Sequence, residues 1–187
     1  ELAALKLTSR DSVLGIAAGG TTPYVLGALE IVKKGWSDGA TERRRDGAPL
    51  TALLSCTPLA KPAFVDHLMV IETGPEVLTG STRMKAGTAT KLALNTISTT
   101  LMIRSGKVYE NLMVDMRATN AKLRDRAARI VATLTGLSRD ESFSLLDRAS
   151  GSVKCAVVMH GMGIDAAAAE KMLAEADGKL ERVLPKT

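Results

Sequence analysis

The sequence predicts an α/β fold with a parallel sheet, followed by a small three-helix bundle. Three strand-then-helix repeats predict the sheet, because each begins with a short continuous apolar run, at residues 12–17, 50–55 and 67–71. Such runs are typical of strands buried on both faces. Residues 136–187 contain three short helical patterns joined by glycine-containing turns, which predict the bundle. We therefore expect two domains, at residues 1–135 and 136–187.

Composition limits the classes of partner. A chain of 187 residues that is 45% hydrophobic can bury one good core, which must be aliphatic because only 3% of the residues are aromatic. The net charge of +5 suits acidic small molecules. We expect no nucleic acid partner, because the cations are scattered and their one run, Arg43–Arg45, has no interleaved aromatic residues. No apolar run approaches the roughly 18 residues of a membrane span.

The two cysteines, Cys56 and Cys155, lie far apart and without the spacing of metal ligands. This pattern favours buried thiols in a reducing compartment over a disulfide or a metal site. We therefore expect a cytoplasmic protein with no bound metal.

The first strand leads into a glycine-rich turn, Ala18-Gly-Gly-Thr-Thr-Pro23, and then into a helix expected over residues 24–34. A strand, a glycine-rich turn and a helix in this order point backbone amides at a phosphate. A bare Gly-Gly turn is by itself a weak signal for such a site.

The second strand is expected at residues 50–55, and Pro58 prevents its continuation. The third strand, residues 67–71, precedes a turn and a long helix over residues 86–104. The apolar residues of that helix recur with helical spacing, which predicts a wide buried face, and Gly106 ends it.

The remaining helices follow from their caps. Thr119 or Asn120 caps a helix that reaches Thr135. Ser138 and Glu141 form a capping box that opens the bundle. The bundle helices are expected at residues 141–149, 152–160 and 166–176.

Residues 74–88, between the third strand and the long helix, combine glycines and hydroxyls with Arg83 and Lys85. A helix start leaves backbone N–H groups unpaired and carries the positive end of the helix dipole, so this composition favours a phosphate or carboxylate site. The alternative is a helix cap with ordinary surface cations. Ligands of parallel sheets bind at the carboxyl ends of strands, so we expect this stretch and the turn at residues 19–22 to converge on one anion.

The same stretch also resembles a known signature. The run GPEVLTGSTRMKAGTATKLALN, followed by GKVYENLMVDMRATNAKLRDRA, resembles the signature region of the N-acetylmuramic acid 6-phosphate etherases, which are sugar isomerase (SIS) fold proteins related to the glucokinase regulatory proteins. The likeness extends from about Asp11 to the C-terminus. It implies a partial SIS-type three-layer αβα sandwich in residues 1–135, whose N-terminal part is missing, and a bundle similar to ubiquitin-associated (UBA) domains in residues 136–187.

The resemblance and the anion-site pattern together give the substrate-binding candidates. These are Gly20, Thr22, Glu76, Ser81, Thr82, Arg83 and Lys107. Glu76 could bond a sugar hydroxyl or cap the turn that it begins. Lys107 resembles a ligand-proximal lysine of the relatives, which would reach the site from a neighbouring subunit. The family's first turn usually reads Ser-Gly-Arg-Thr, so Gly19 and Thr21 remove one hydroxyl and one guanidinium, which puts the ligand affinity in question.

The resemblance implies an enzyme of amino sugar recycling that cleaves the lactyl ether of N-acetylmuramic acid 6-phosphate to N-acetylglucosamine 6-phosphate and D-lactate. One carboxylate would take the C2 proton, and a second carboxyl group would protonate the departing oxygen before water adds, with no metal or organic cofactor. The family's two glutamates fall before residue 1, so we expect this chain to supply the phosphosugar-binding half of a homodimeric lyase and to be inactive alone. A non-catalytic phosphosugar sensor of the glucokinase-regulatory type is the open alternative, which the altered first turn favours.

Overall fold

The computed structural model describes residues 5–37, 48–116 and 120–184, so the arginine run at residues 43–45 lies outside the described residues. The chain divides into two compact units, residues 1–95 and 96–187, and helix α2 (Lys85–Arg104) contains the division. The mixed α/β class and the parallel sheet are confirmed. The domain boundary expected after residue 135 stays a prediction.

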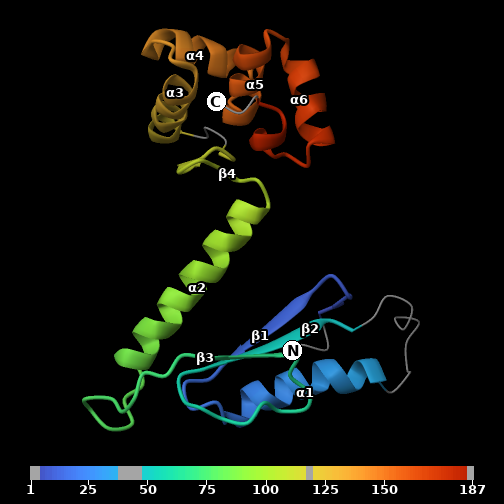
Figure 1. Ribbon diagram of the computed structural model, residues 1–187, viewed down its shortest axis with the longest axis vertical. Helices are drawn as coiled ribbons and strands as arrows, with labels where there is room; N and C mark the ends of the chain where they lie inside the picture. Colours follow the sequence, from blue (N-terminus) through green and yellow to red (C-terminus); the bar gives the residue numbers. More distant parts are fainter. Residues whose placement is uncertain (1–4, 38–47, 117–119, 185–187) are drawn as a thin grey trace. The chain divides into compact units, whose positions relative to one another are not determined.

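The first unit contains a three-stranded parallel sheet in the order β1-β2-β3. Its central strand pairs with both neighbours, with Gly15 opposite Leu53 and Leu54 opposite Met69. Figure 1 shows helix α1 packed along one side of this sheet. All four predicted elements are present within three residues of the expected ends: β1 (Ser12–Ile16), α1 (Pro23–Ser37), β2 (Leu50–Ser55) and β3 (His67–Val70).

The core of this unit lies between α1 and the sheet. Leu29 of α1 and Leu53 of β2 are completely buried there. Gly15 permits this close packing, because a Cβ atom at that position would lie 2.7 Å from Val25 Cγ1 and 2.8 Å from Leu29 Cδ1. Burial of the central strand is what the continuous apolar run at residues 50–55 predicts.

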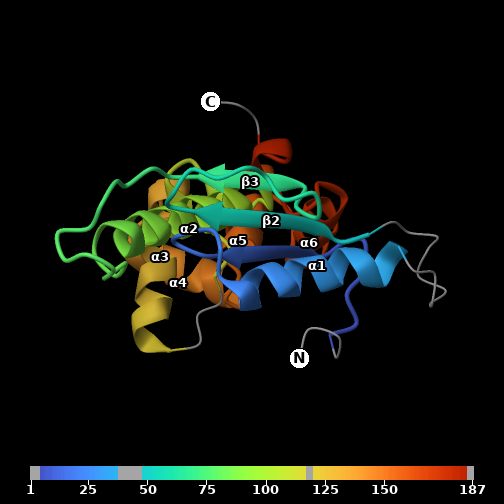
Figure 2. The same ribbon diagram turned by 90° about the horizontal axis from the view of Figure 1, so that it is seen from below.

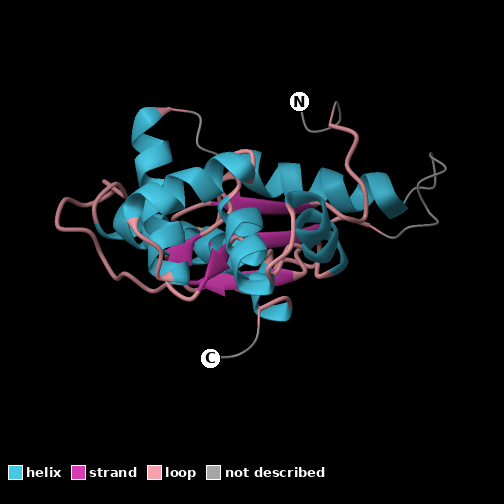
Figure 3. Cartoon of the chain, turned by 90° about the horizontal axis from the view of Figure 1, so that it is seen from above, coloured by secondary structure: helices cyan, strands magenta, loops and turns pink. Residues whose placement is uncertain are grey.

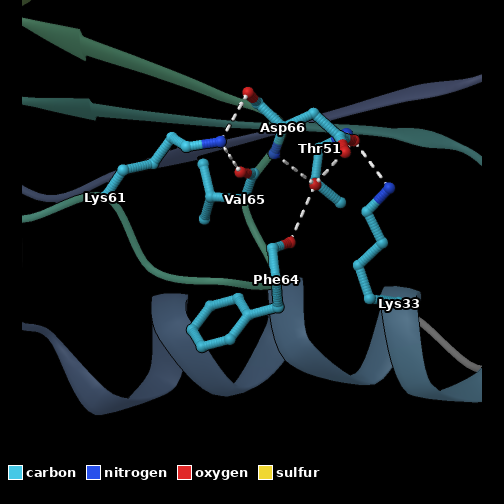
Figure 4. A network of polar contacts seen from close by, with 6 residues as sticks. All are labelled: Lys33, Thr51, Lys61, Phe64, Val65 and Asp66. Carbon is cyan, nitrogen blue, oxygen red and sulfur yellow. Dashed lines mark hydrogen bonds and ion pairs between the residues drawn. The ribbon is translucent and has the colours of Figure 1, made fainter.

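A polar network closes the amino end of the sheet, next to α1 (Figure 4). The Asp66 carboxylate accepts hydrogen bonds from the backbone N–H of Thr51 at 2.8 Å and from its hydroxyl at 3.0 Å. Lys33 Nζ of α1 lies 2.7 Å from the same carboxylate. These contacts fasten the start of β3 to β2 and to the helix, at the opposite end of the strands from the predicted ligand turns.

The wide buried face predicted for α2 is wrong. Of its residues only Ala86 is buried, whereas Leu92 is 58% exposed and Leu101 is 57% exposed. Helical spacing of apolar residues shows which side of a helix would face a neighbour, but it does not supply the neighbour.

Among its described residues, the second unit contains the end of α2, a β-hairpin and four further α-helices. The hairpin strands β4 (Val108–Tyr109) and β5 (Leu112–Met113) pair antiparallel. The three expected bundle helices are present, and α3 packs against the first two of them. Figure 3 distinguishes the helices of the chain from its strands. The helices are α3 (Ala121–Thr135), α4 (Arg139–Arg148), α5 (Val153–Met162) and α6 (Ala166–Glu175), followed by a 3-10 turn at Leu180–Arg182.

Helix α5 forms the centre of this unit, since all residues from Val153 to Met159 are buried. The caps are those that the sequence predicts. Asn120 accepts a hydrogen bond from the Leu123 N–H at 2.8 Å, and Ser138 and Glu141 form the capping box. The side chain of Asp165 caps α6. Capping residues in the local sequence therefore determine where these helices begin. The apolar sequence of α5 explains why this helix is buried among the others.

Candidate functional site

The two turns that the sequence singled out lie at the same end of the sheet. The strands are parallel, and each turn follows the carboxyl end of its strand, as Figure 2 shows for residues 17–22 after β1 and residues 71–84 after β3. This end of a parallel sheet is where ligands of α/β proteins bind.

In the first turn, Gly20 has a structural role. Its φ of 72° is unfavourable for other residues, and its N–H donates to Ala17 O at 2.9 Å. A Cβ atom there would lie 2.9 Å from Leu59 and 3.0 Å from Ser55 Oγ. Its amide is therefore committed to the turn rather than available to an anion. Thr22, whose carbonyl accepts the first hydrogen bonds of α1, is exposed.

Glu76 caps the start of α2. One carboxylate oxygen accepts from the Lys85 N–H at 2.9 Å and the other from the Ala86 N–H at 3.0 Å. These two backbone hydrogen bonds lower the pKa of Glu76 below its usual value. The anion position at this helix start is therefore occupied by the protein's own carboxylate, which favours the capping alternative for Glu76.

Ser81, Thr82 and Arg83 directly precede α2, the helix whose first amides bind Glu76. Ser81 is half-buried, whereas Thr82 and Arg83 are exposed. The backbone of this segment is held in place, because the Ser81 N–H donates to Leu78 O at 3.0 Å and Thr82 O accepts from the Gly87 N–H at 2.9 Å. Within residues 5–37, 48–116 and 120–184, no ion pair engages the Arg83 guanidinium.

The end of β2 joins the two turns, through residues that the sequence did not identify as part of the site. The Cys56 N–H donates to Ala18 O of the first turn at 2.9 Å. Its Sγ atom lies 3.6 Å from Ala86 O and 3.6 Å from Thr90 Oγ1 of α2. The glycine turn and the Glu76-capped helix start are thus both attached to one buried residue. The sequence predicted that Cys56 is a buried thiol and that Pro58 ends the strand, but neither signal indicated that Cys56 contacts both turns.

Lys107 belongs to the second unit, where it precedes the β4–β5 hairpin. Its carbonyl accepts from the N–H groups of Val114 and Asp115, and its Nζ lies 3.6 Å from Asp115 Oδ2. Asp115 Oδ1 in turn lies 3.0 Å from Nζ of Lys154 on α5. Burial acts to raise the pKa of Asp115, but the hydrogen bond from Lys154 and the charges of both lysines outweigh it, so the pKa is lowered.

Sequence reasoning missed Lys154. This residue is only 9% exposed, and it is the single charged side chain among the buried residues that the structure describes. The signal was present, since Lys154 interrupts an otherwise apolar run from Val153 to Met159. A cation in such a run is an expensive residue to bury without a partner, which should prompt a search for one.

Two further properties concern metals and membranes. In the described part of the chain, no three His, Cys, Asp or Glu side chains gather in a way that could hold a metal ion. None of the described helices combines the length and the apolar character needed to cross a bilayer. Cys56 and Cys155 are buried free thiols, as predicted.

Comparison with known proteins finds relatives that are named N-acetylmuramic acid 6-phosphate etherase. The chain is 45% identical over 98% of its length to N-acetylmuramic acid 6-phosphate etherase 1 of Bacillus licheniformis, covering 57% of that protein. It is 47% identical over 95% of its length to the etherase of Prochlorococcus marinus, covering 52% of it. The Salmonella paratyphi B etherase is 46% identical over 98% of this chain, which covers 58% of that relative. No protein-family model matches the chain.

The chain spans about half the length of the curated relatives that it matches. The identity extends over both units, so it is not confined to the signature region at residues 74–127. Over nearly its whole length the chain is thus similar to one part of the N-acetylmuramic acid 6-phosphate etherases, which confirms the resemblance that its signature residues carry.

Proposed function

We propose that this chain supplies the phosphosugar-binding part of an enzyme that cleaves the D-lactyl ether of N-acetylmuramic acid 6-phosphate. The products would be N-acetylglucosamine 6-phosphate and D-lactate, by a carbon–oxygen lyase reaction of amino sugar recycling. The observation that carries the proposal is the 45–47% identity to proteins named as this etherase, over 95–98% of the chain.

The geometry of the first unit supports a binding role for Ser81, Thr82 and Arg83. Glu76 already satisfies the first amides of α2, so a ligand phosphate would be bound by these three side chains rather than by the helix start. The Arg83 guanidinium can bind a phosphate through two parallel hydrogen bonds, and the two hydroxyls add further donors. Thr22, after the parallel strand β1, would contribute a hydroxyl from the neighbouring turn.

The finer features of the fold and assembly belong to the same proposal. We propose that the three strands form part of a SIS-type αβα sandwich and that α4, α5 and α6 form a UBA-like bundle. The active protein would be a cytoplasmic homodimer in which Lys107 reaches the phosphosugar of a neighbouring subunit. Support for these features comes from the sequence likeness to the etherases.

The test is release of D-lactate from N-acetylmuramic acid 6-phosphate by the complete natural protein. Affinity for N-acetylglucosamine 6-phosphate, measured by isothermal titration, then tests the site. The double variant Ser81→Ala/Arg83→Ala should weaken binding by about a hundredfold, because it removes one charge-assisted and one neutral contact. Arg126→Ala is the matched control, since Arg126 is an exposed arginine on α3.

The outcomes separate the enzyme from the sensor. Unchanged affinity in the double variant would show that Ser81 and Arg83 do not bind the sugar. Tight binding of the phosphosugar without any release of D-lactate would refute the enzymatic proposal and favour a non-catalytic sensor.

A further inference from the structure

The Lys107–Asp115–Lys154 cluster lies entirely within the second unit and joins the hairpin to α5. Asp115 is shared by two ammonium groups, with Lys154 Nζ at 3.0 Å from one oxygen and Lys107 Nζ at 3.6 Å from the other. The three groups together carry one surplus positive charge. The Asp115 carboxylate can therefore neutralise the charge of only one of the two lysines.

Lys154 is the primary ion-pair partner of the Asp115 carboxylate, because it is the more buried of the two lysines. The side chain of Lys154 is 11% exposed, whereas that of Lys107 is 45% exposed. A buried ammonium without a partner costs several kcal/mol, and Asp115 is the ion-pair partner of Lys154 among the described residues.

Lys107 is held by its backbone rather than by its charge. Its carbonyl accepts hydrogen bonds at 3.1 Å and 3.3 Å from the other end of the hairpin. Gly106, just before it, packs against the turn after α6, where a Cβ atom would lie 2.8 Å from Lys179 Cγ. At 3.6 Å its ammonium is attracted by Asp115 but lies beyond hydrogen-bond distance, so it can turn to an anionic ligand without leaving the carboxylate unpaired.

We infer that Lys154 is a positioning residue for Lys107: by holding Asp115, it prevents this carboxylate from capturing the Lys107 ammonium and leaves that ammonium available to the phosphate of the ligand. The inference rests on the proposed function, in which Lys107 contacts the phosphosugar. It adds that Lys154, which touches no ligand itself, sets the affinity through a carboxylate.

The test is a set of variants assayed for N-acetylglucosamine 6-phosphate binding in the complete protein. Lys107→Met should weaken binding by about tenfold, the effect of losing one charged contact. Lys154→Met should weaken it by about threefold to tenfold, because Asp115 then pairs with Lys107 alone. Lys154→Met/Asp115→Asn should restore binding to within about twofold of the wild type, since the competing charge is removed. In a Lys107→Met background, Lys154→Met should have no further effect.

A second readout is independent of the sugar. Acetic anhydride labels neutral amines, so its rate at Lys107, followed by mass spectrometry across pH, reports how firmly that ammonium keeps its proton. Lys154→Met should slow labelling, and the double variant should reverse the change. Exposed Lys122 on α3 is the internal reference, and thermal melting identifies any variant that fails to fold. The charged groups recorded around Lys107 are Asp115 and Lys154, with the side chain of Lys179 packed beside Gly106.

The results distinguish the two proposals. If folded Lys154→Met binds as the wild type does, or if the double variant binds no better than the single one, the positioning role is wrong. If the wild type binds no phosphosugar, the proposed function fails. The labelling rates of Lys107 then test the charge arrangement by themselves. Equal rates in the wild type, in Lys154→Met and in Lys154→Met/Asp115→Asn would overturn it.

Discussion

Asp66 allows the most detailed prediction of stability, because its carboxylate just before β3 binds partners on two other elements of the first unit, α1 and β2. The Lys33 ammonium and the Thr51 N–H and hydroxyl all bind its carboxylate. The hydrogen bond from Lys33, followed by that from the Thr51 backbone, lowers the pKa of Asp66 from 3.8 to about 2, against the opposing effect of burial. Asp66→Asn keeps the shape of the side chain but removes its charge and one acceptor oxygen.

The magnitude follows from this pKa. Lowering it from 3.8 to about 2 corresponds to at most about 2.5 kcal/mol of stability. The Asp66 side chain is 36% exposed, so solvent screening reduces the charge contribution to about 1 kcal/mol. Because the folded-state pKa is depressed, this contribution is fully present above pH 3.8 and is lost as the pH falls through about 2.

Urea unfolding of wild type and Asp66→Asn at neutral pH and at pH about 2 measures the charge contribution. Amide hydrogen exchange of β2 gives a local readout within the first unit. The difference between the proteins should be about 1 kcal/mol at neutral pH and should shrink in acid. Asp147→Asn is the control, because it removes an exposed pair with Arg124 that should contribute less than about 0.5 kcal/mol. An equal difference at both pH values would show that the ionised carboxylate is not the stabilising species.

Two further changes test the site's framework. Gly20→Ala should lower the stability of the first unit by about 1–3 kcal/mol in thermal melts, because an alanine is strained at a φ of 72° and its Cβ would lie too close to Leu59. Gly27→Ala is the control and should be tolerated, since a Cβ there meets nothing within 4 Å. Equal losses of stability in the two variants would refute the structural role of Gly20. Glu76→Ala should speed the hydrogen exchange of the Lys85 and Ala86 amides, since both lose their acceptor, and it should leave the exchange of α5 amides unchanged; slow exchange in the variant would show that another group caps α2.

Two features of the candidate site could not be predicted from the sequence: which anion caps α2, and what Cys56 contacts. The composition of residues 74–88 indicated an anion at a helix start, and there is one, but it is the carboxylate of Glu76. Composition could not distinguish an internal anion from an external one, because both are stabilised by the same amides. The role of Cys56 could not be predicted either, since its contacts lie 30 and 34 residues away in the sequence.

The sequence by itself determined the elements and their local ends. Continuous apolar runs placed β1, β2 and β3, and capping residues such as Asn120 and Ser138 placed the helix starts, because both signals act between near neighbours in the chain. The likeness to the etherases was also contained in the residues alone.

Only the tertiary structure decided which surfaces and charges are paired. The apolar spacing of α2 predicted a buried face that the structure does not show. Lys154, the cation in the apolar run of α5, pairs with Asp115, which lies 39 residues earlier in the sequence, just after the hairpin. Burial and ion pairing depend on what residues distant in sequence bring to the same place, and a local pattern contains no record of that.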